Sequence, residues 1–392
     1  MNILYLADAR IPTEKAHGVA IAKMVEALAK AGHQVSLILS KRQAGKESII
    51  KEDLFSYYLV NRVFKVKRLF CFDFQCLHQL GLGKLAFLIR TPIFLIELMV
   101  LTILNTDKVI YTRDGLIAGA ASLFNKKVFF EPHRPPSVKS RGYYQKVFGR
   151  LKGIITLTKR EKETLVREYG LSPEKVKVEP SAIDLNDFVL PDKSSVRKKL
   201  GIPQDRTVLS YIGKLNIIGQ AKKLDELVGA FKKALAVNSK LFLLIGGLKP
   251  EDLNYHNDLI KKEGLGNDAA LLPHVPFNQV REYYAASDIF LLPYDKHVLE
   301  NLSLSPLKLF EYAASRKPLI CSRSESIEEI FNESEIVYFQ AGNYDDLVKK
   351  IMELSDDASR REQIAEKAFA KVKNYTWQRR AANLTAFIQS RL

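Results

Sequence analysis

A lysine and a glutamate lie three residues apart in a segment that otherwise predicts a buried helix. The segment NLSLSPLKLFEYAASRKPLI covers residues 301–320 and contains Lys308 and Glu311. Ser305 predicts a capping hydroxyl, and Pro306 predicts the first helical position. Apolar residues fill most of the following turns, so the helix should be largely buried. The two charges form either an internal ion pair, with the Lys308 stem packed and its ammonium reaching water, or part of a binding site.

Further cations follow a predicted strand in the second half of the chain. The strand TVLSYIG covers residues 207–213, Lys214 follows it directly, and Lys222 and Lys223 open the next helix. Cations near a helix N-terminus oppose the helix dipole, which favours anions there. These lysines are either plainly solvated or placed to bind a phosphate. Because a carboxylate suits a ribose diol and lysines suit a diphosphate, Glu311 and the lysines together predict a nucleotide site.

The loop after the first predicted strand is a candidate anion site. In ADARIPTEKAHGVAIAK, Gly18 stands at the start of a helix. Backbone N–H groups and the helix dipole bind anions at such a position, although glycine also simply permits tight turns. The sequence has no G-x-G-x-x-G there and no G-x-x-x-x-G-K-[ST] anywhere, which argues against a dinucleotide oxidoreductase and a P-loop nucleotidase.

Short apolar runs alternate with helix-like segments along the chain, which is typical of parallel α/β architecture. The predicted strands cover residues 2–8, 33–40, 108–112, 127–131, 153–158, 207–213, 241–247, 269–275, 288–294, 318–322 and 336–340. A chain of 392 residues exceeds what one core usually serves. We therefore predict two doubly wound domains facing a cleft, residues 1–190 and 191–375, with a C-terminal helix over 376–392 packing back on the first.

The first half of the chain is strongly basic. Residues 1–190 hold 30 Lys and Arg against 18 Asp and Glu, a net charge of +12, whereas residues 191–392 hold 30 against 26, a net of +4. Basic residues are interleaved with aromatic ones over 60–70 and 139–153. Such stretches suit lipid headgroups or nucleic acid, or form a solvated basic face. Because no nucleic-acid recognition motif occurs, we expect an anionic membrane surface and no nucleic acid as partner.

The most apolar stretch, residues 85–104, is interrupted by Arg90, Pro92 and Glu97, so we predict no membrane-spanning helix. It is either a buried helix of the first domain or a helix that lies on a membrane surface.

The cysteines indicate a reducing compartment. Cys71, Cys76 and Cys321 form neither a C-x-x-C pair nor a metal-ligand spacing, and the N-terminus lacks the layout of a secretion signal. We expect a cytoplasmic protein.

The order of these segments resembles the retaining glycosyltransferases of family 4, which have the GT-B fold. EYYAASDIFLLPY followed by SPLKLFEYAASRKPLICS is similar to the donor-binding end of that family. DARIPTEKAHGVAIAKMVEALAKAGHQVSLI, YTRDGLIAGAASLFNKKVFFEPH and ITLTKREKETLVREYGLSPEKVKVEPSAIDLNDF are similar to its earlier segments. The resemblance covers almost the whole chain and is loosest between residues 41 and 105, where acceptor contacts would be expected.

The resemblance implies a set of donor-binding residues. The family's ribose-binding glutamate corresponds to Glu311, and its diphosphate-binding cations correspond to Lys214 and Lys222. Gly18 would approach the phosphates, and Leu307 would contribute its backbone.

The resemblance also implies a histidine at the reacting carbon and one departure from the family. His133, in an E-P-H context, would touch the donor sugar. The family often has a Glu-x7-Glu pair, but Ser303 stands eight residues before Glu311. The donor sugar would then be oriented by backbone N–H groups around Ser303–Pro306, beside Lys308.

The implied reaction moves a sugar from a nucleoside diphosphate to an acceptor hydroxyl with retention. His133, Lys214 and Lys222 form the expected catalytic set, since prepositioned cations stabilise the departing diphosphate. No D-x-D motif occurs, so we expect neither a metal nor another cofactor.

We expect a lipid-linked or cell-envelope glycan acceptor and a peripheral position on the inner face of the cytoplasmic membrane. The alternatives are a soluble transferase, and a GT-B protein that binds a nucleotide sugar or glycan without turnover.

Overall fold

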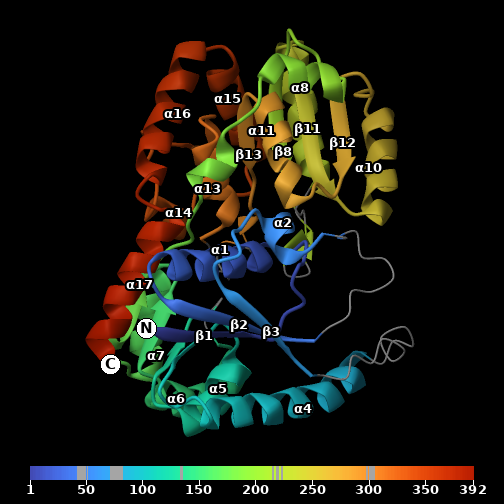
Figure 1. Ribbon diagram of the computed structural model, residues 1–392. Coiled ribbons are helices and arrows are strands. Elements are labelled where there is room, and N and C mark those ends of the chain that lie inside the picture. The colour runs from blue at the N-terminus through green and yellow to red at the C-terminus, as the bar shows by residue number, and fades with distance from the viewer. Residues whose placement is uncertain are drawn as a thin grey trace. The chain divides into compact units, whose positions relative to one another are not determined.

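The chain folds into two compact units. The computed structural model describes residues 1–41, 50, 52–70, 83–132, 136–213, 216–217, 220–221, 224–296, 299 and 305–392. Unit 1 comprises Met1–Pro180 and Trp377–Leu392, and unit 2 comprises Ser181–Thr376 (Figure 1). Each unit has its own parallel sheet with helices on both faces, so the predicted α/β class with two doubly wound sheets is confirmed.

The boundary between the units lies earlier than predicted. Unit 2 begins at Ser181 and not at residue 191. Residues 181–190 belong to unit 2 because Ile183 and Phe188 are buried in its core and Ile183 pairs with Thr376. The loose sequence pattern there hid these contacts.

The sheet of unit 1 has seven parallel strands in the order β3-β2-β1-β4-β5-β6-β7. The strands are β1 (Asn2–Ala7), β2 (Gln34–Ser40), β3 (Lys65–Leu69), β4 (Val109–Thr112), β5 (Val128–Phe130), β6 (Gly153–Thr156) and β7 (Val176–Val178). The predicted strands of this half are all present, and β3 and β7 were missed. Both are edge strands in which lysines interrupt the apolar residues, so they lack the apolar run that marks a central strand.

Helices cover both faces of this sheet (Figure 1). They are α1 (Ala16–Lys30), α2 (Leu54–Tyr58), α4 (Gly83–Ile103), α5 (Gly115–Phe124), α6 (Arg141–Arg150), α7 (Lys159–Tyr169) and α17 (Trp377–Arg391). Helix α17 packs beside α1 on one face, while α4, α5 and α6 lie next to one another on the opposite face.

Helix α4 corresponds to the apolar segment 85–104, and its interpretation as a buried helix is wrong for its outer side. Phe94 and Leu98 are buried in the core of unit 1, but Leu88 and Ile96 are exposed by 65% and 63%. A single helix on one face of a sheet can bury only one side. In the described part of the chain, no helix reaches the length and apolar character of a membrane span.

The sheet of unit 2 has six parallel strands in the order β12-β11-β8-β13-β14-β15, at the predicted positions. The strands are β8 (Thr207–Ile212), β11 (Leu241–Leu248), β12 (Ala269–Pro273), β13 (Ile289–Leu292), β14 (Leu319–Ser322) and β15 (Val337–Phe339). A separate antiparallel pair, β9 (Asn216–Ile217) with β10 (Gln220–Ala221), was not predicted.

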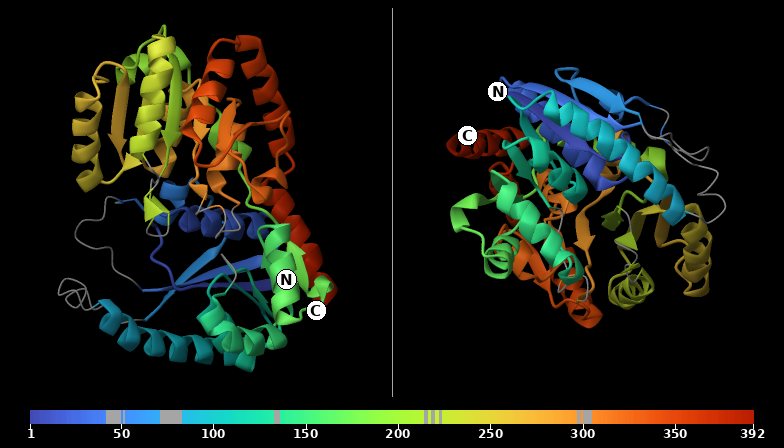
Figure 2. Two further views of the ribbon diagram at one scale, coloured as in Figure 1. Left: turned by 180° about the vertical axis from the view of Figure 1, so that it is seen from behind. Right: turned by 90° about the horizontal axis from the view of Figure 1, so that it is seen from below.

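Both faces of the second sheet also carry helices. They are α8 (Lys193–Leu200), α9 (Leu224–Val237), α10 (Pro250–Lys262), α11 (Val280–Ala286), α13 (Leu307–Ala314), α14 (Glu325–Glu328), α15 (Tyr344–Ser355) and α16 (Ala358–Val372). Seen from behind, α9 and α10 lie in front of this sheet (Figure 2), as right-handed crossovers toward β11 and β12 require.

Each sheet reverses its strand order at one central strand. In unit 1, β1 lies between β2 and β4, and in unit 2, β8 lies between β11 and β13. Ligands of open α/β sheets bind beyond the carboxyl ends of the strands at such switch points. The loop after β1 leads into α1, whose first turn contains Gly18, and the end of β8 leads directly to position 214.

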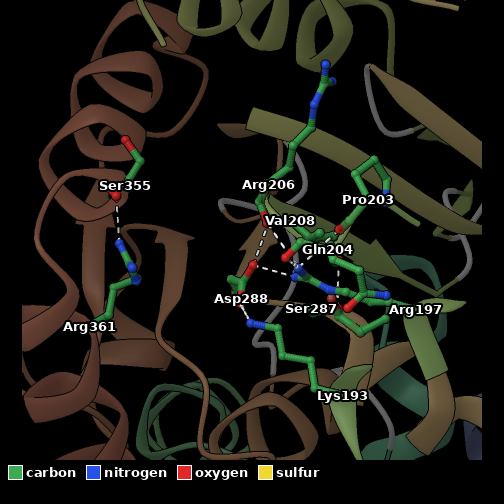
Figure 3. A network of polar contacts seen from close by, with 12 residues as sticks. Lys193, Arg197, Pro203, Gln204, Arg206, Val208, Ser287, Asp288, Ser355 and Arg361 are labelled. Carbon is green, nitrogen blue, oxygen red and sulfur yellow. Dashed lines mark hydrogen bonds and ion pairs between the residues drawn. The ribbon is translucent and has the colours of Figure 1, made fainter. Parts of the chain in front are cut away.

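A buried arginine holds α8 onto the second sheet (Figure 3). The Arg197 guanidinium is almost fully buried and pairs with Asp288 at 2.5 Å, while Lys193 binds the other carboxylate oxygen. Arg197 also donates to backbone carbonyls, among them that of Ala286 at 2.9 Å. Asp288 in turn accepts from the Val208 N–H at 2.8 Å, so the network joins α8, α11 and the start of β8.

Breaking this network should destabilise unit 2. In Arg197→Met the buried carbonyls and Asp288 lose their shared donor, so we expect the free energy of unfolding to fall by about 3–5 kcal/mol. Denaturant titration measures the loss. Lys198→Met, exposed on the same helix, is the matched control and should change stability by less than about 0.5 kcal/mol. Equal stability of the two variants would contradict the role of Arg197.

Glu161 in α7 is a buried acid with an unusual pKa. Its Oε2 accepts from the Leu157 N–H at 3.1 Å, and Oε1 has no hydrogen-bond partner among the described residues. Burial raises the pKa of Glu161 from 4.5 to about 8. Between these two pH values Glu161 is protonated in the folded state and ionised in the unfolded state. The free energy of unfolding therefore falls as the pH rises through this window.

Glu161→Gln should remove this pH dependence. The wild-type free energy of unfolding should fall by up to about 1.4 kcal/mol per pH unit through that window because of this one proton. The variant should therefore be more stable than wild type at pH 8 and lose that advantage near pH 5. Urea titrations at several pH values test this, with the exposed Glu163→Gln as control. An identical pH slope in wild type and Glu161→Gln would refute it.

Candidate functional site

Helix α13 begins differently from the sequence prediction. The helix starts at Leu307, Pro306 occupies the N-cap position, and no N-cap side chain bonds the first turn. The Ser305 hydroxyl instead accepts from the Ser181 N–H at 2.9 Å, and the Ser181 hydroxyl donates to the Ser305 carbonyl at 2.5 Å. The prediction that Ser305 caps the helix is therefore wrong, because the first residue of unit 2 occupies its hydroxyl.

Helix α13 is fixed against the carboxyl end of β8. The Tyr312 hydroxyl accepts from the Ile212 N–H at 3.0 Å and donates to the Ile212 carbonyl at 3.2 Å. One residue further on, a Cβ on Gly213 would lie only 2.7 Å from Cε of Lys308. Gly213 is thus the residue that allows the Lys308 stem to cross the end of the switch-point strand.

The Glu311 carboxylate is nearly buried and takes two strong hydrogen bonds. The residue is only 4% exposed. Its Oε2 accepts from the Tyr284 hydroxyl at 2.6 Å and from Nζ of Lys308 at 2.8 Å. Nζ of Lys308 also lies 3.0 Å from the Tyr284 hydroxyl. The ion pair considered from the sequence exists, and a tyrosine of α11 completes it.

The surrounding phenols stay protonated. Burial raises the pKa of Tyr284 well above its ordinary value, and the Glu311 carboxylate raises it further. Burial and the same carboxylate also raise the pKa of Tyr211. Tyr284 therefore acts as a hydrogen-bond donor to Glu311 throughout the physiological pH range.

This arrangement suits a polyhydroxylated, anionic ligand. A carboxylate offers about four acceptor positions, so two donors on one oxygen leave room for the hydroxyls of a diol. The Lys308 side chain is about one quarter exposed, so its charge faces the same edge. The first-turn N–H groups of α13 and the helix dipole add a preference for negative charge.

Gly18 lies at the start of α1 in unit 1, and packing explains why this residue is a glycine. A Cβ at Gly18 would lie 2.1 Å from the Tyr58 hydroxyl. That hydroxyl accepts from the Thr13 N–H at 2.6 Å and donates to the Thr13 carbonyl at 2.9 Å, which holds the loop after β1. The Gly18 N–H donates to the Lys15 carbonyl at 3.0 Å. A phosphate contact by Gly18 stays a prediction.

A second buried carboxylate, that of Glu131, directly follows β5. Glu131 pairs with Arg380 of α17 at 2.9 Å and with Arg113 at 3.2 Å, and it accepts from the Tyr111 hydroxyl. Burial opposes the ionisation of Glu131, but the two guanidinium groups outweigh it, and the pKa of Glu131 lies below its ordinary value. Residue 133 follows two positions later, so this network anchors the strand end that leads to the predicted histidine.

The structure brings together part of the predicted site. Pro306, Leu307, Lys308 and Glu311 gather on one helix of unit 2, at the end of β8. The other predicted residues of this set, His133, Lys214, Lys222 and Ser303, lie outside the described residues.

Sequence reasoning missed the residues that hold the Glu311 carboxylate in place. Tyr312 was counted among the apolar residues of its helix, Tyr284 was given no role of its own, and Gly213 was read as the end of a strand. Tyrosines on helices belong to the core far more often than to a site, so only the packing reveals that two of them orient this helix.

Two family models match consecutive parts of the chain. The model for glycosyltransferase family 4 matches residues 17–187, and the model for glycosyl transferases group 1 matches residues 192–371. The chain belongs to the family 4 glycosyltransferases. The recognition of this family from the sequence is thereby confirmed.

The curated relatives of this glycosyltransferase are distant. A D-inositol 3-phosphate glycosyltransferase of Stackebrandtia nassauensis is 25% identical over 240 residues, 59% of this chain and 52% of the relative. The corresponding protein of Kribbella flavida is 22% identical over 234 residues, 57% of this chain and 53% of the relative. The chain thus spans about half the length of these relatives.

Solved structures share the fold along the whole chain. A glycosyltransferase from Rickettsia africae superposes with a TM-score of 0.74 at 15% identity, covering 100% of this chain and 98% of that chain. HepE of Anabaena, solved in complex with UDP-glucose, superposes with a TM-score of 0.70 at 15% identity and covers 100% of both chains. The fold is that of the GT-B glycosyltransferases.

Tyr284→Phe should weaken the anchoring of Glu311. The variant keeps the ring but removes one of the two donors on Oε2, so we expect the free energy of unfolding to fall by about 1–3 kcal/mol. Tyr283→Phe, the less buried neighbour on α11, is the control and should be nearly neutral. Urea titration compares the two, and an equal effect would show that the hydroxyl of Tyr284 has no special role.

Proposed function

We propose that this protein transfers a sugar from a nucleoside diphosphate sugar to an acceptor hydroxyl. The observation that carries the proposal is the Glu311 carboxylate, held by Tyr284 and Lys308 at the carboxyl end of the switch-point strand β8. A carboxylate at this position is the usual partner of a ribose diol. Similarity in fold to HepE, solved with UDP-glucose, supports a nucleotide sugar as donor.

In the proposed reaction, Lys214 and Lys222 stabilise the negative charge that develops on the departing diphosphate. His133 contacts the donor sugar near its reacting carbon, and the backbone from Ser303 to Leu307 orients that sugar. Gly18 contributes a further contact to the phosphates. The leaving phosphate accepts the proton of the acceptor hydroxyl, so the sugar bonds on the same face and its configuration is retained.

Replacing Glu311 or Lys222 should impair transfer through different steps. Glu311→Gln keeps an acceptor for Tyr284 but loses the charge, and should weaken nucleotide binding by about 10–100-fold. Lys222→Ala should lower kcat by about 100-fold or more. Transfer is followed by release of the nucleoside diphosphate, with the exposed Glu366→Gln and Lys240→Ala as controls. Near-normal turnover in both site variants, with the fold intact, would end the assignment.

The donor can be identified by a thermal-shift screen. A ligand that binds only the native state raises the melting temperature. We expect one of the uridine, guanosine or adenosine diphosphates, alone or with a sugar, to stabilise the protein, and Glu311→Gln to lose that shift. Binding without hydrolysis or transfer of any sugar in the panel would favour a non-catalytic binding protein instead.

We further propose that catalysis needs no metal ion, because the lysines supply the positive charge beside the diphosphate. Treatment with EDTA followed by desalting should leave the transfer rate within about twofold of its starting value, since Lys222 and not a metal ion stabilises the charge of the departing diphosphate. A rate that falls and is restored by added Mg²⁺ or Mn²⁺ would refute this point alone.

The proposed acceptor is a lipid-linked or cell-envelope glycan, with the enzyme peripheral on the inner face of the cytoplasmic membrane. The basic charge of residues 1–190 supports this assignment. The curated relatives support a second candidate, since they are named D-inositol 3-phosphate glycosyltransferases. Parallel assays with a polyprenyl-diphosphate glycan and with inositol 3-phosphate discriminate between the two acceptors.

A further inference from the structure

Two neighbouring helices of unit 1 expose apolar side chains on their outer surfaces, as far as the structure describes them. Every exposed residue in the described part of α4 is apolar, and so is every exposed residue of α5. On α4 these residues are Leu85, Leu88, Ile89, Pro92, Ile96, Val100 and Ile103, and on α5 they are Leu116, Leu123 and Phe124. A water-facing helix of a globular protein carries polar residues on its outer side, so this composition needs an explanation.

The residues of α4 form one continuous stripe. Their spacing of three, four and seven residues repeats along the helix, so they lie within about half of its circumference. Phe94 and Leu98, on the opposite side, are buried in the core of unit 1. Leu104, just beyond the end of α4, extends the stripe and is 74% exposed. Helix α4 therefore has apolar residues both on the side that faces the core and on the outer side.

The apolar surfaces of α4 and α5 face the same way. The two helices pack against each other and cover the same face of the first sheet (Figure 1). Helices on one face of a sheet present their outer sides in a common direction. We call the exposed residues of α4 and α5, with Leu104, the apolar plate.

Basic residues border the apolar plate. Helix α6, which packs against α5, exposes Arg141, Lys146 and Arg150 and contains no acidic residue. Lys126, just after the end of α5, and Lys139, just before the start of α6, are also exposed. Nε of Arg150 donates to the Ser122 hydroxyl at 3.1 Å, which fixes this guanidinium at the edge of α5.

We infer that the apolar plate lies in the surface of a bilayer containing anionic lipids, with the basic border at the headgroups. Leucine, isoleucine and phenylalanine side chains enter the headgroup and acyl boundary to a depth of about 5–10 Å, and nearby cations attract anionic lipids. The exposed Tyr143 ring on α6 is suited to the same interface. No membrane-spanning helix is required.

Charge complementarity favours a lipid surface over a second copy of the chain. In a twofold dimer built on the apolar plate, each basic border would meet the like-charged surroundings of the same plate on the partner. An anionic membrane instead neutralises that border. This inference deepens the proposed function. The link between membrane binding and a lipid-linked acceptor rests on that function, but membrane binding itself is measurable without sugar transfer.

The first test is sedimentation of the full chain with vesicles of phosphatidylcholine, with and without phosphatidylglycerol. We expect salt-sensitive binding to the anionic vesicles. The triple variant Leu88→Ser/Ile96→Ser/Val100→Ser should bind at least about tenfold more weakly, because three side chains no longer enter the lipid. Val189→Ser/Val237→Ser/Tyr255→Ser removes comparably exposed apolar residues from unit 2 and should bind like wild type.

A second pair of variants tests the basic border. Lys139→Glu/Lys146→Glu should weaken binding to anionic vesicles by about fivefold or more, since each lysine near a charged bilayer contributes to attraction. Lys240→Glu/Lys261→Glu changes the net charge equally on unit 2 and should have much less effect.

Insertion depth gives a readout that simple adsorption does not change. The single native tryptophan, Trp377, is buried, so a tryptophan at position 96 reports on the plate. Brominated lipids should quench Ile96→Trp and leave Val237→Trp unquenched.

Three outcomes would overturn the inference. They are absence of vesicle binding by the wild type, equal losses in the plate and control variants, and a wild-type dimer that the plate variant dissociates without any lipid binding. The proposed function is tested separately with a water-soluble acceptor. It fails if Glu311→Gln and Lys222→Ala retain near-normal transfer to that acceptor, whereas the plate variant should retain this activity even though it binds lipid weakly.

Discussion

A carboxylate that is buried away from water needs hydrogen-bond donors at its buried position. In unit 2, the carboxylate of Glu311 has this need. Its two donors come from different elements, Tyr284 from α11 and Lys308 from its own helix. Tyr312 adds the bonds that fix the same helix to the end of β8. The orientation of α13 follows from these few contacts, and with it the position of the carboxylate at the switch point of the sheet.

The same requirement links distant parts of the chain elsewhere. Glu131 directly follows β5 and pairs with Arg380, which joins the C-terminal helix to the first sheet. Arg197 and Asp288 tie α8 to the second sheet in the same manner. A buried charge of this kind adds little net stability, since desolvation offsets the attraction, but removing one partner is costly. These pairs therefore determine which elements meet more than how stable the fold is.

The outer surface of unit 1 follows a different rule. A helix that covers a sheet needs only one apolar side for the fold, and α4 and α5 have apolar residues on the other side as well. Folding does not explain these residues, because they gain nothing from the core. They lie beside α6, a helix that contains basic residues and no acidic ones. The basic composition of this half of the chain is therefore found next to this apolar surface.

The sequence by itself determined the fold class, most of the central strands and the family. Central parallel strands are buried on both faces, so they are continuous apolar runs. Runs such as TVLSYIG and DIFLLPY can therefore be predicted as strands without knowing which strands they pair with. The edge strands β3 and β7 were missed, because lysines interrupt their apolar residues and neither strand forms a continuous apolar run. The sequence also singled out Lys308 and Glu311, since charges in an apolar helix are unusual wherever they occur.

Only the tertiary structure decided what those residues contact. The pattern around Ser305 predicts a cap, but Ser181, more than a hundred residues away in the chain, occupies the hydroxyl. Likewise, the sequence prediction assigned residues 181–190 to the first domain, but Ile183 and Phe188 are buried in unit 2. The apolar segment 85–104 looks buried, but a helix on the surface of one sheet has only one neighbour to pack against. In each case the structure depends on contacts with residues that are distant in the sequence, and a local sequence pattern cannot predict such contacts.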